Sequence, residues 1–136
     1  MPEYMSRTAQ SGAIPPKRVL VVDDEPQVAD TIRMVLALSG HQVDLAESAG
    51  RALELYELGK YDLIISDYSL GKMNGLDLAR AIKQRCATQP IILITAYAES
   101  MALQKELLTD IDYMLGKPFA LSQLQEALST LFTPPA

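Results

Sequence analysis

The stretch that decides the fold is DLIISDYSLGKMNG, residues 62–75. Its apolar run, Leu63 to Ile65, is continuous rather than alternating, which is typical of a strand that is covered on both faces. Asp67 stands just after this run, and a stretch of helical period begins at Gly75. A buried strand, a polar loop and a helix in this order form a βα unit. The stretch therefore predicts a parallel sheet whose strands alternate with helices.

The rest of the chain repeats this alternation on both sides. Continuous apolar runs at residues 19–22 and 91–94 predict two further central strands, an alternating run at 42–46 predicts an edge strand, and residues 113–115 are a fifth candidate. Period and capping residues predict helices from Pro26 to Gly40, from Ser48 to Gly59, from Gly75 to about Arg85 and from about Glu99 to Thr109, and a last helix along the apolar stripe Leu121, Leu124, Leu128 and Leu131. The expected fold class is α/β, with a five-stranded parallel sheet.

One domain with tails accounts for the length of the chain. The 136 residues suffice for one sizeable core and are too few for two ordinary domains. Residues 1–16 are rich in polar residues and proline and show no strand or helix period, so we expect a flexible N-terminal tail. The domain should cover residues 17–132, because prolines in the last residues cannot continue a helix. Residues 133–136 are expected to form a C-terminal tail or the start of a linker.

Charge and cysteine content exclude several classes of partner. The formal net charge of -5 would repel a nucleic-acid backbone, which argues against direct nucleic-acid binding. Cys86 is the single cysteine and cannot form an internal disulfide, and no apolar run approaches the roughly 20 residues that cross a bilayer. We therefore expect a cytoplasmic protein without a membrane segment.

Polar residues follow the predicted strands at their carboxyl ends. They are Asp23-Asp24-Glu25, Asp67, Thr95 and Lys117. Because the carboxyl ends of parallel strands share one edge of a sheet, these side chains should meet there. Carboxylates gathered at one place repel one another unless a cation neutralises them, and Mg²⁺ prefers such oxygen ligands. A carboxylate such as Asp67 can attack phosphorus when a metal and a fixed cation such as Lys117 neutralise the phosphoryl oxygens.

Each of these residues also has a simpler interpretation. An Asp-Asp-Glu run before a helix is by itself most often a solvated N-terminal cap. Asp67 could cap the following turn, Lys117 could be a surface lysine, and threonine is common at strand ends because of its strand propensity. Their joint position directly after buried strands favours the other interpretation, in which a carboxylate takes up a phosphoryl group with the help of a metal ion.

Four blocks of sequence carry a resemblance to a known family. They are Val21-Val22-Asp23-Asp24-Glu25, residues 62–75, Ile94-Thr95-Ala96 and Lys117-Pro118-Phe119. In this order and spacing they resemble the signature blocks of response-regulator receiver domains of two-component systems, over roughly residues 17–132. The resemblance implies a flavodoxin-like (βα)5 three-layer sandwich with the strand order 2-1-3-4-5.

The resemblance further implies that Asp67 is the phosphoacceptor and that Mg²⁺ is the cofactor. Asp24 and Asp67 would bind Mg²⁺ directly, together with the backbone carbonyl of Ser69. Asp23 would act mostly through a bound water.

The same resemblance implies contacts on the other side of the phosphoryl group. Thr95, Ala96 and Lys117 would contact it, and Thr95 would shift on phosphorylation. The peptide bond between Lys117 and Pro118 would be cis, a geometry that is accessible before proline.

The chain departs from the family pattern at two positions. Gly71 stands where the family usually has proline, so the loop after Asp67 should be more flexible. The family's aromatic switch position falls on Met114, because Tyr113 lies one place earlier and so points to the opposite face of the strand. We expect Met114, or the loop around Tyr97, to report phosphorylation instead. Tyr97 should also obstruct the water that hydrolyses the phosphoryl group, which predicts a long-lived phosphorylated state.

The expected function is therefore signalling and not turnover of a small substrate. A histidine kinase or a phosphotransfer protein would phosphorylate Asp67, and the surface of the fourth helix, fifth strand and fifth helix would engage a downstream protein or an output domain; a homodimer is also open. One alternative is a receiver module excised from a hybrid histidine kinase or a multidomain regulator. A less favoured alternative is a magnesium-dependent aspartyl phosphohydrolase, which needs an acid–base aspartate in an Asp-x-Asp run that Asp67-Tyr68-Ser69 lacks.

Overall fold

The computed structural model describes residues 14–133 of the chain. Its parallel sheet is formed by β1 (Arg18–Val22), β2 (Gln42–Ala46), β3 (Leu63–Asp67), β4 (Ile91–Thr95) and β5 (Tyr113–Gly116). These strands lie in the order β2-β1-β3-β4-β5, so the predicted fold class and strand order are confirmed. The order reverses between β1 and β3, and parallel sheets bind ligands at the carboxyl edge beside such a reversal.

The connecting helices are α2 (Pro26–Leu38), α3 (Ala49–Leu58), α4 (Gly75–Arg85), α5 (Ala98–Ala102), the 3-10 helix η1 (Lys105–Leu108) and α6 (Leu121–Phe132). Local sequence explains where several of them begin. Pro26 is the first residue of α2, where a missing N–H costs no helical hydrogen bond. The predicted cap of α3 is confirmed, because Ser48 Oγ accepts a hydrogen bond from the Arg51 N–H at 3.1 Å. Asn74 caps α4 in the same way, through the Asp77 N–H at 2.9 Å.

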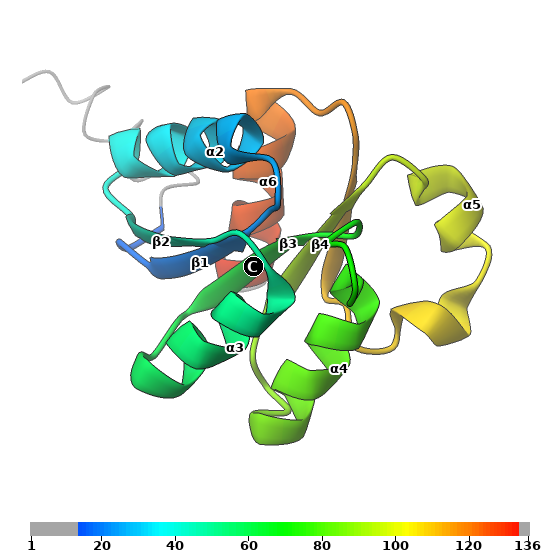
Figure 1. Cartoon of the computed structure of the whole chain (residues 1–136). Coiled ribbons are helices and arrows are strands. Elements are labelled where there is room, and N and C mark those ends of the chain that lie inside the picture. The colour runs from blue at the N-terminus through cyan, green and yellow to red at the C-terminus, as the bar shows by residue number, and fades with distance from the viewer. Residues whose placement is uncertain (1–13, 134–136) are drawn as a thin grey trace, which may run out of the picture.

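The sheet is the middle of three layers. Helices α2 and α6 cover one face, α3 and α4 cover the other, and α5 lies at the β5 side of the molecule (Figure 1). Neighbouring residues of β1 belong to opposite cores: Val19 and Val21 pack with α2 and α6, whereas Leu20 and Val22 pack with α3 and α4. The central strands are thus buried on both faces, which is why their apolar runs are continuous.

The expectation of one continuous helix from Glu99 to Thr109 is wrong. Helix α5 ends at Ala102, and Gln104 has the non-helical angles φ −114° and ψ 68° before η1 begins. None of the four residues of η1, all of which the structure describes, is buried. A helix that buries no apolar face gains little from tertiary packing, and a short isolated helix is marginal in water. The segment therefore breaks into two short turns.

The apolar stripe of the last helix is also shorter than expected. Leu124 and Leu128 are buried, but Leu121 is 48% exposed. Leu121 lines an apolar groove of about 320 Å³ that lies between α2 and α6, together with Val28 and Phe119. The first residue of the stripe therefore belongs to the surface.

The described residues include contacts near both expected limits of the domain. Helix α6 ends at Phe132, near the predicted end of the domain. Ile14 packs against the core beneath α2 and α6, so core contacts begin inside the segment expected to be a tail. Residues 1–13 and 134–136 of the two expected tails lie outside the described residues. Within residues 14–133, no helix is long and apolar enough to cross a membrane.

Candidate functional site

The strand ends that the sequence singled out reach one edge of the sheet. Asp23 follows β1, Asp67 ends β3, Thr95 ends β4 and Lys117 follows β5. Hydrogen bonds between strands continue into these loops: the Lys117 N–H donates to the Thr95 carbonyl at 2.8 Å, and the Asp23 N–H donates to the Ala46 carbonyl at 3.0 Å. The sheet therefore holds the loops in place, and residues from both ends of the domain become neighbours.

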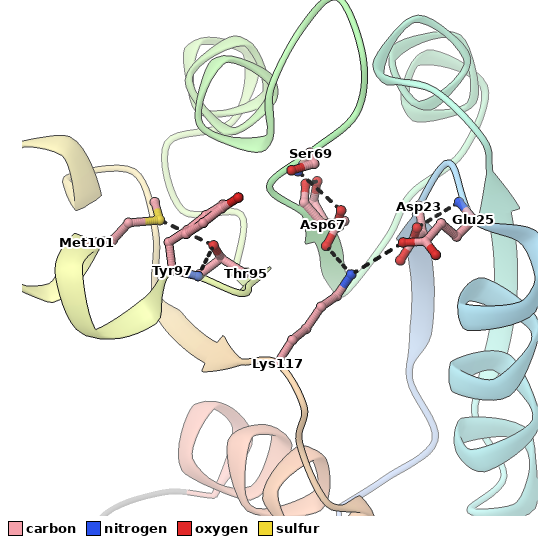
Figure 2. A network of polar contacts seen from close by, with 9 residues as sticks. Asp23, Glu25, Asp67, Ser69, Thr95, Tyr97, Met101 and Lys117 are labelled. Atoms are coloured by element: carbon pink, nitrogen blue, oxygen red, sulfur yellow. Dashed lines mark hydrogen bonds and ion pairs between the residues drawn. The ribbon is translucent and has the colours of Figure 1, made fainter.

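An ion pair between Asp67 and Lys117 lies at the centre of this edge (Figure 2). Lys117 Nζ is 2.7 Å from Asp67 Oδ1 and 4.0 Å from Glu25 Oε1. The second oxygen of Asp67, Oδ2, accepts a hydrogen bond from the Ser69 N–H at 3.2 Å. Because Asp67 is only 4% exposed, its carboxylate is held in a fixed orientation. The pair places a carboxylate, a group that can act as a nucleophile, beside a positive charge that could neutralise an anionic group.

The neighbours of Lys117 keep it charged. Burial lowers the pKa of Lys117, but the hydrogen bond with Asp67 and the negative charges of Asp67, Asp23 and Glu25 outweigh burial and raise this pKa above its ordinary value of 10.5. Lys117 therefore remains protonated at neutral pH and acts as a fixed cation.

Asp23 is buried with one oxygen left without a partner. The residue is 2% exposed, and its Oδ1 accepts a hydrogen bond from the Glu25 N–H at 2.8 Å. Its Oδ2 is buried and has no hydrogen-bond partner among residues 14–133. Burial raises the pKa of Asp23 to about 6; the Glu25 N–H opposes this rise and the charge of Asp67 adds to it. A buried oxygen of this kind is destabilising unless a proton or a cation occupies the adjacent space.

Further oxygen ligands for a divalent cation surround Asp23. One oxygen from each of Asp23, Asp24 and Glu25 lies within 4.8 Å of the others. Asp24 and Glu25 are exposed, so water can reach the same position. This donor set fits Mg²⁺, which binds few carboxylates and keeps several waters. The unpartnered Oδ2 of Asp23 is the observation that supports the fit.

The hydroxyl of Thr95 is engaged by α5 and the loop before it. Thr95 is 1% exposed, and its Oγ1 accepts a hydrogen bond from the Tyr97 N–H at 3.0 Å and donates one to Met101 Sδ at 3.4 Å (Figure 2). Sequence reasoning missed Met101, because residue spacing does not show that a short helix folds back over Thr95. The adjacent Ala96 is exposed, and the peptide bond between Lys117 and Pro118 is cis.

Two glycines shape the loop that follows Asp67. The Gly75 N–H donates to the Tyr68 carbonyl at 2.8 Å, and a Cβ on Gly75 would lie 2.5 Å from the Asp67 carbonyl oxygen and 2.7 Å from Leu93 Cδ1. Only glycine lets α4 begin so close to the site. Gly71 has φ +86°, a left-handed conformation that proline cannot adopt. The loop therefore follows a path that would not be available with proline at this position.

The two residues expected to report phosphorylation lie in different elements, Met114 in β5 and Tyr97 in the loop after β4. Met114 is half-buried in β5, in register with Leu93, whereas Tyr113 packs into the core beneath α2 and α6. Tyr97 is 58% exposed, and its ring makes an edge contact with Tyr68 at a centroid distance of 6.3 Å. The Tyr68–Tyr97 contact thus joins the loops that follow β3 and β4.

Comparison with known proteins gives matches over most of the chain. The sequence profile of the response regulator receiver domain matches residues 19–129. The transcriptional regulatory protein DltR of Streptococcus agalactiae is 35% identical over 107 residues, which are 79% of this chain and 48% of DltR. The transcriptional regulatory protein CusR of Escherichia coli is 34% identical over 114 residues, 84% of this chain and 50% of CusR. The chain spans about half the length of these curated relatives.

Solved structures match it over nearly their whole length. The response regulator protein TrrA of Thermotoga maritima, in complex with Mg(2+)-BeF, has a TM-score of 0.78 and 33% identity, with 85% of this chain and 99% of TrrA covered. The receiver domain of Francisella response regulator 1452 has a TM-score of 0.76 and 27% identity, with 85% of this chain and 95% of that chain covered. The fold described above is therefore shared with both proteins.

Proposed function

The chain belongs to the response regulator receiver domain family, and on this basis we propose that Asp67 is the carboxylate that accepts its phosphoryl group. Members of this family are signalling phosphoacceptor domains of two-component systems. The observation that carries the assignment to Asp67 is its ion pair with Lys117, at 2.7 Å, in a buried site. The unpartnered Oδ2 of Asp23 supports a cation beside this pair.

The proposed reaction uses Asp67 as a nucleophile. One of its carboxylate oxygens forms a bond to phosphorus while the bond from phosphorus to the histidine nitrogen of the donor breaks, and that nitrogen keeps the electron pair. Lys117 stays protonated and neutralises one of the phosphoryl oxygens. Mg²⁺, held by Asp24, Asp67 and the backbone carbonyl of Ser69 with Asp23 behind them, would supply the remaining positive charge.

We propose a protein partner on each side of this reaction. A histidine kinase or a phosphotransfer protein would supply the phosphoryl group. The surface of α5, η1, β5 and α6 would then engage an output domain, a separate downstream protein or a second copy of the chain. This surface exposes Leu103 (86%), Leu107 (44%) and Leu121 (48%), and exposed apolar side chains favour contact with a protein. The net charge of -5 disfavours contact with a nucleic acid. We propose that this phosphoryl transfer takes place in the cytoplasm. The single cysteine, Cys86, cannot form an internal disulfide, which fits a reducing compartment.

Incubation with acetyl phosphate and Mg²⁺ tests the assignment of Asp67. Intact-mass spectrometry should show one added phosphoryl group on the wild-type chain and none on Asp67→Asn, because the amide is not a nucleophile. Asp62→Asn is the matched control, since Asp62 precedes the strand that Asp67 ends and its amide oxygen can still accept the hydrogen bond of the Arg18 N–H. Labelling of Asp67→Asn would overturn the assignment. Steady hydrolysis of a phosphomonoester would instead support the phosphohydrolase.

A further inference from the structure

Both hydrogen-bonding functions of the Thr95 hydroxyl are directed away from Asp67. The oxygen accepts from the Tyr97 N–H at 3.0 Å, and the proton is donated to Met101 Sδ at 3.4 Å. Figure 2 shows the hydroxyl between Tyr97 and Met101, on the opposite side of the site from Lys117 and Asp23. Because Thr95 is buried, water does not offer its proton another acceptor. The thioether is therefore the partner that fixes this orientation.

Met101 also anchors the helix that carries it. Helix α5 has five residues, and Met101 is the one buried side chain in this fully described element. A five-residue helix is too short to be stable alone, so its position depends on that side chain. The Met101 N–H is bonded to the Tyr97 carbonyl at 2.9 Å, and Tyr97 in turn donates to Thr95. Hydrogen bonds thus connect Thr95, Tyr97 and Met101 in a ring, and this ring links the site to α5.

We propose that Met101 is a positioning residue for Thr95, whose sulfur holds the threonine hydroxyl on the α5 side and opposes its contact with a phosphoryl group on Asp67. The inference rests on the proposed function of Asp67. A hydroxyl has a single proton to donate, so Thr95 cannot donate to a phosphoryl oxygen and to Met101 at once. Phosphorylation therefore removes the polar link between Thr95 and the buried anchor of α5. Movement of α5 follows from the loss of this link.

A purely structural role of Met101 predicts a different result. Leucine fills nearly the same volume as methionine but has no sulfur acceptor. If Met101 only packs, Met101→Leu leaves phosphoryl-analogue binding unchanged. If Met101 holds the Thr95 hydroxyl, Met101→Leu frees this hydroxyl and tightens binding of the analogue.

The test measures beryllofluoride affinity at saturating Mg²⁺ for the full chain. We expect Met101→Leu to bind beryllofluoride roughly three- to tenfold more tightly than wild type, the equivalent of one weak hydrogen bond. Mg²⁺ affinity should not change. In a Thr95→Val background the effect of Met101→Leu should vanish, because the hydroxyl through which Met101 acts is absent. Unchanged affinity of Met101→Leu, or an equal gain in the Thr95→Val background, would refute the positioning role.

A measurement on the wild-type chain covers the case in which Met101→Leu fails to fold. With methionine methyl groups labelled with ¹³C, beryllofluoride and Mg²⁺ should shift the Met101 signal in wild type and not in Thr95→Val. The Met34 signal, from an exposed residue of α2, serves as the control. A Met101 signal that stays unmoved in wild type contradicts the inference.

Failure of the phosphoacceptor assignment can be distinguished from failure of the role of Met101. If the wild-type chain binds no beryllofluoride and Asp67 takes up no phosphoryl group, both the phosphoacceptor assignment and the role of Met101 fall. If the wild-type chain binds the analogue and Met101→Leu binds it equally well, only the role of Met101 falls.

Discussion

At the scale of single residues, the carboxyl edge of the sheet contains both an attractive ion pair and a repulsive pair of carboxylates. Asp67 and Lys117 form a close pair, while Asp23 lies near enough for the charge of Asp67 to raise its pKa. The Glu25 N–H satisfies one oxygen of Asp23 and leaves the other without a partner among the described residues. The metal-free site therefore contains one destabilising negative charge, whose effect depends on pH.

We predict that Asp23→Asn stabilises the metal-free protein at pH 7.5. Burial raises the pKa of Asp23 from 3.8 to about 6 in the folded state, so the folded protein binds a proton that the unfolded chain releases between these values. The contribution of Asp23 to stability is thus present at low pH and lost as the pH rises through about 6. The asparagine is neutral throughout and should gain roughly 1–3 kcal/mol at pH 7.5, where the upper value corresponds to the full rise in the pKa of Asp23.

Urea unfolding in EDTA at several pH values measures this effect. The difference between Asp23→Asn and wild type should shrink as the pH falls toward 3.8. Asp30→Asn, which removes an exposed charge on α2, controls for the change in net charge. A difference that is independent of pH would contradict the role of Asp23 ionisation.

Tyr97 allows a prediction about the lifetime of the phosphorylated state. Its ring contacts Tyr68, which directly follows Asp67, so we expect the two rings to cover part of the proposed phosphorylation site. Tyr97→Ala removes this cover and should accelerate hydrolysis several-fold, because water gains access to the phosphorus. Tyr97→Phe keeps the ring and should hydrolyse at the wild-type rate. The rate of phosphate loss, monitored by ³¹P NMR, measures this effect. Equal rates for all three proteins would exclude Tyr97 as the group that obstructs the attacking water.

At the scale of elements, the junction between β3 and α4 sets the position of Asp67. Gly75→Ala should lower the free energy of unfolding by about 2 kcal/mol and weaken phosphorylation, because the new Cβ would lie 2.5 Å from the Asp67 carbonyl oxygen. Gly50→Ala in α3 is the control: its Cβ would meet only Ser48 Oγ at 3.9 Å, and helix propensity favours alanine. Urea unfolding of both variants measures the difference. Equal stabilities would show that α4 can shift freely.

The short α5 is the second element with consequences for function. It is held by one buried methionine, and η1 beyond it buries none of its four described residues. Elements with few buried contacts have low local stability and can move when a single contact is lost. The helix proposed to transmit a signal, α5, thus buries fewer residues than α2, α3, α4 or α6.

At the scale of the whole molecule, we expect folding and Mg²⁺ binding to be linked. The proposed Mg²⁺ ligands come from the ends of different strands, so the proposed site can form only in the folded chain. Saturation with Mg²⁺ at 100 times its dissociation constant should stabilise the protein by about 2.7 kcal/mol, which raises Tm by about 10 °C. Asp24→Asn should lose most of this increase, and Asp30→Asn should keep it. Thermal unfolding with and without Mg²⁺ measures both, and an equal increase in Asp24→Asn would exclude Asp24 as a ligand.

The sequence by itself determined the α/β class and the edge of the sheet at which Asp67 and Lys117 meet. Strands buried on both faces need continuous apolar residues, and the runs around Val21, Ile64 and Ile92 meet this need locally. Once the strands are parallel, their carboxyl ends share an edge, so Asp67 and Lys117 could be expected to meet. The strand order came from the family resemblance, because periodicity alone does not say which strands are neighbours.

Only the tertiary structure decided how the side chains at this edge are engaged. The break after α5, the exposure of Leu121, the unpartnered oxygen of Asp23 and the bond from Thr95 to Met101 all depend on which segments pack together. Residue spacing reports contacts within one helix or strand, whereas these features arise between segments that are joined by loops. Their energies come from burial and from orientation, and both are properties of the folded chain.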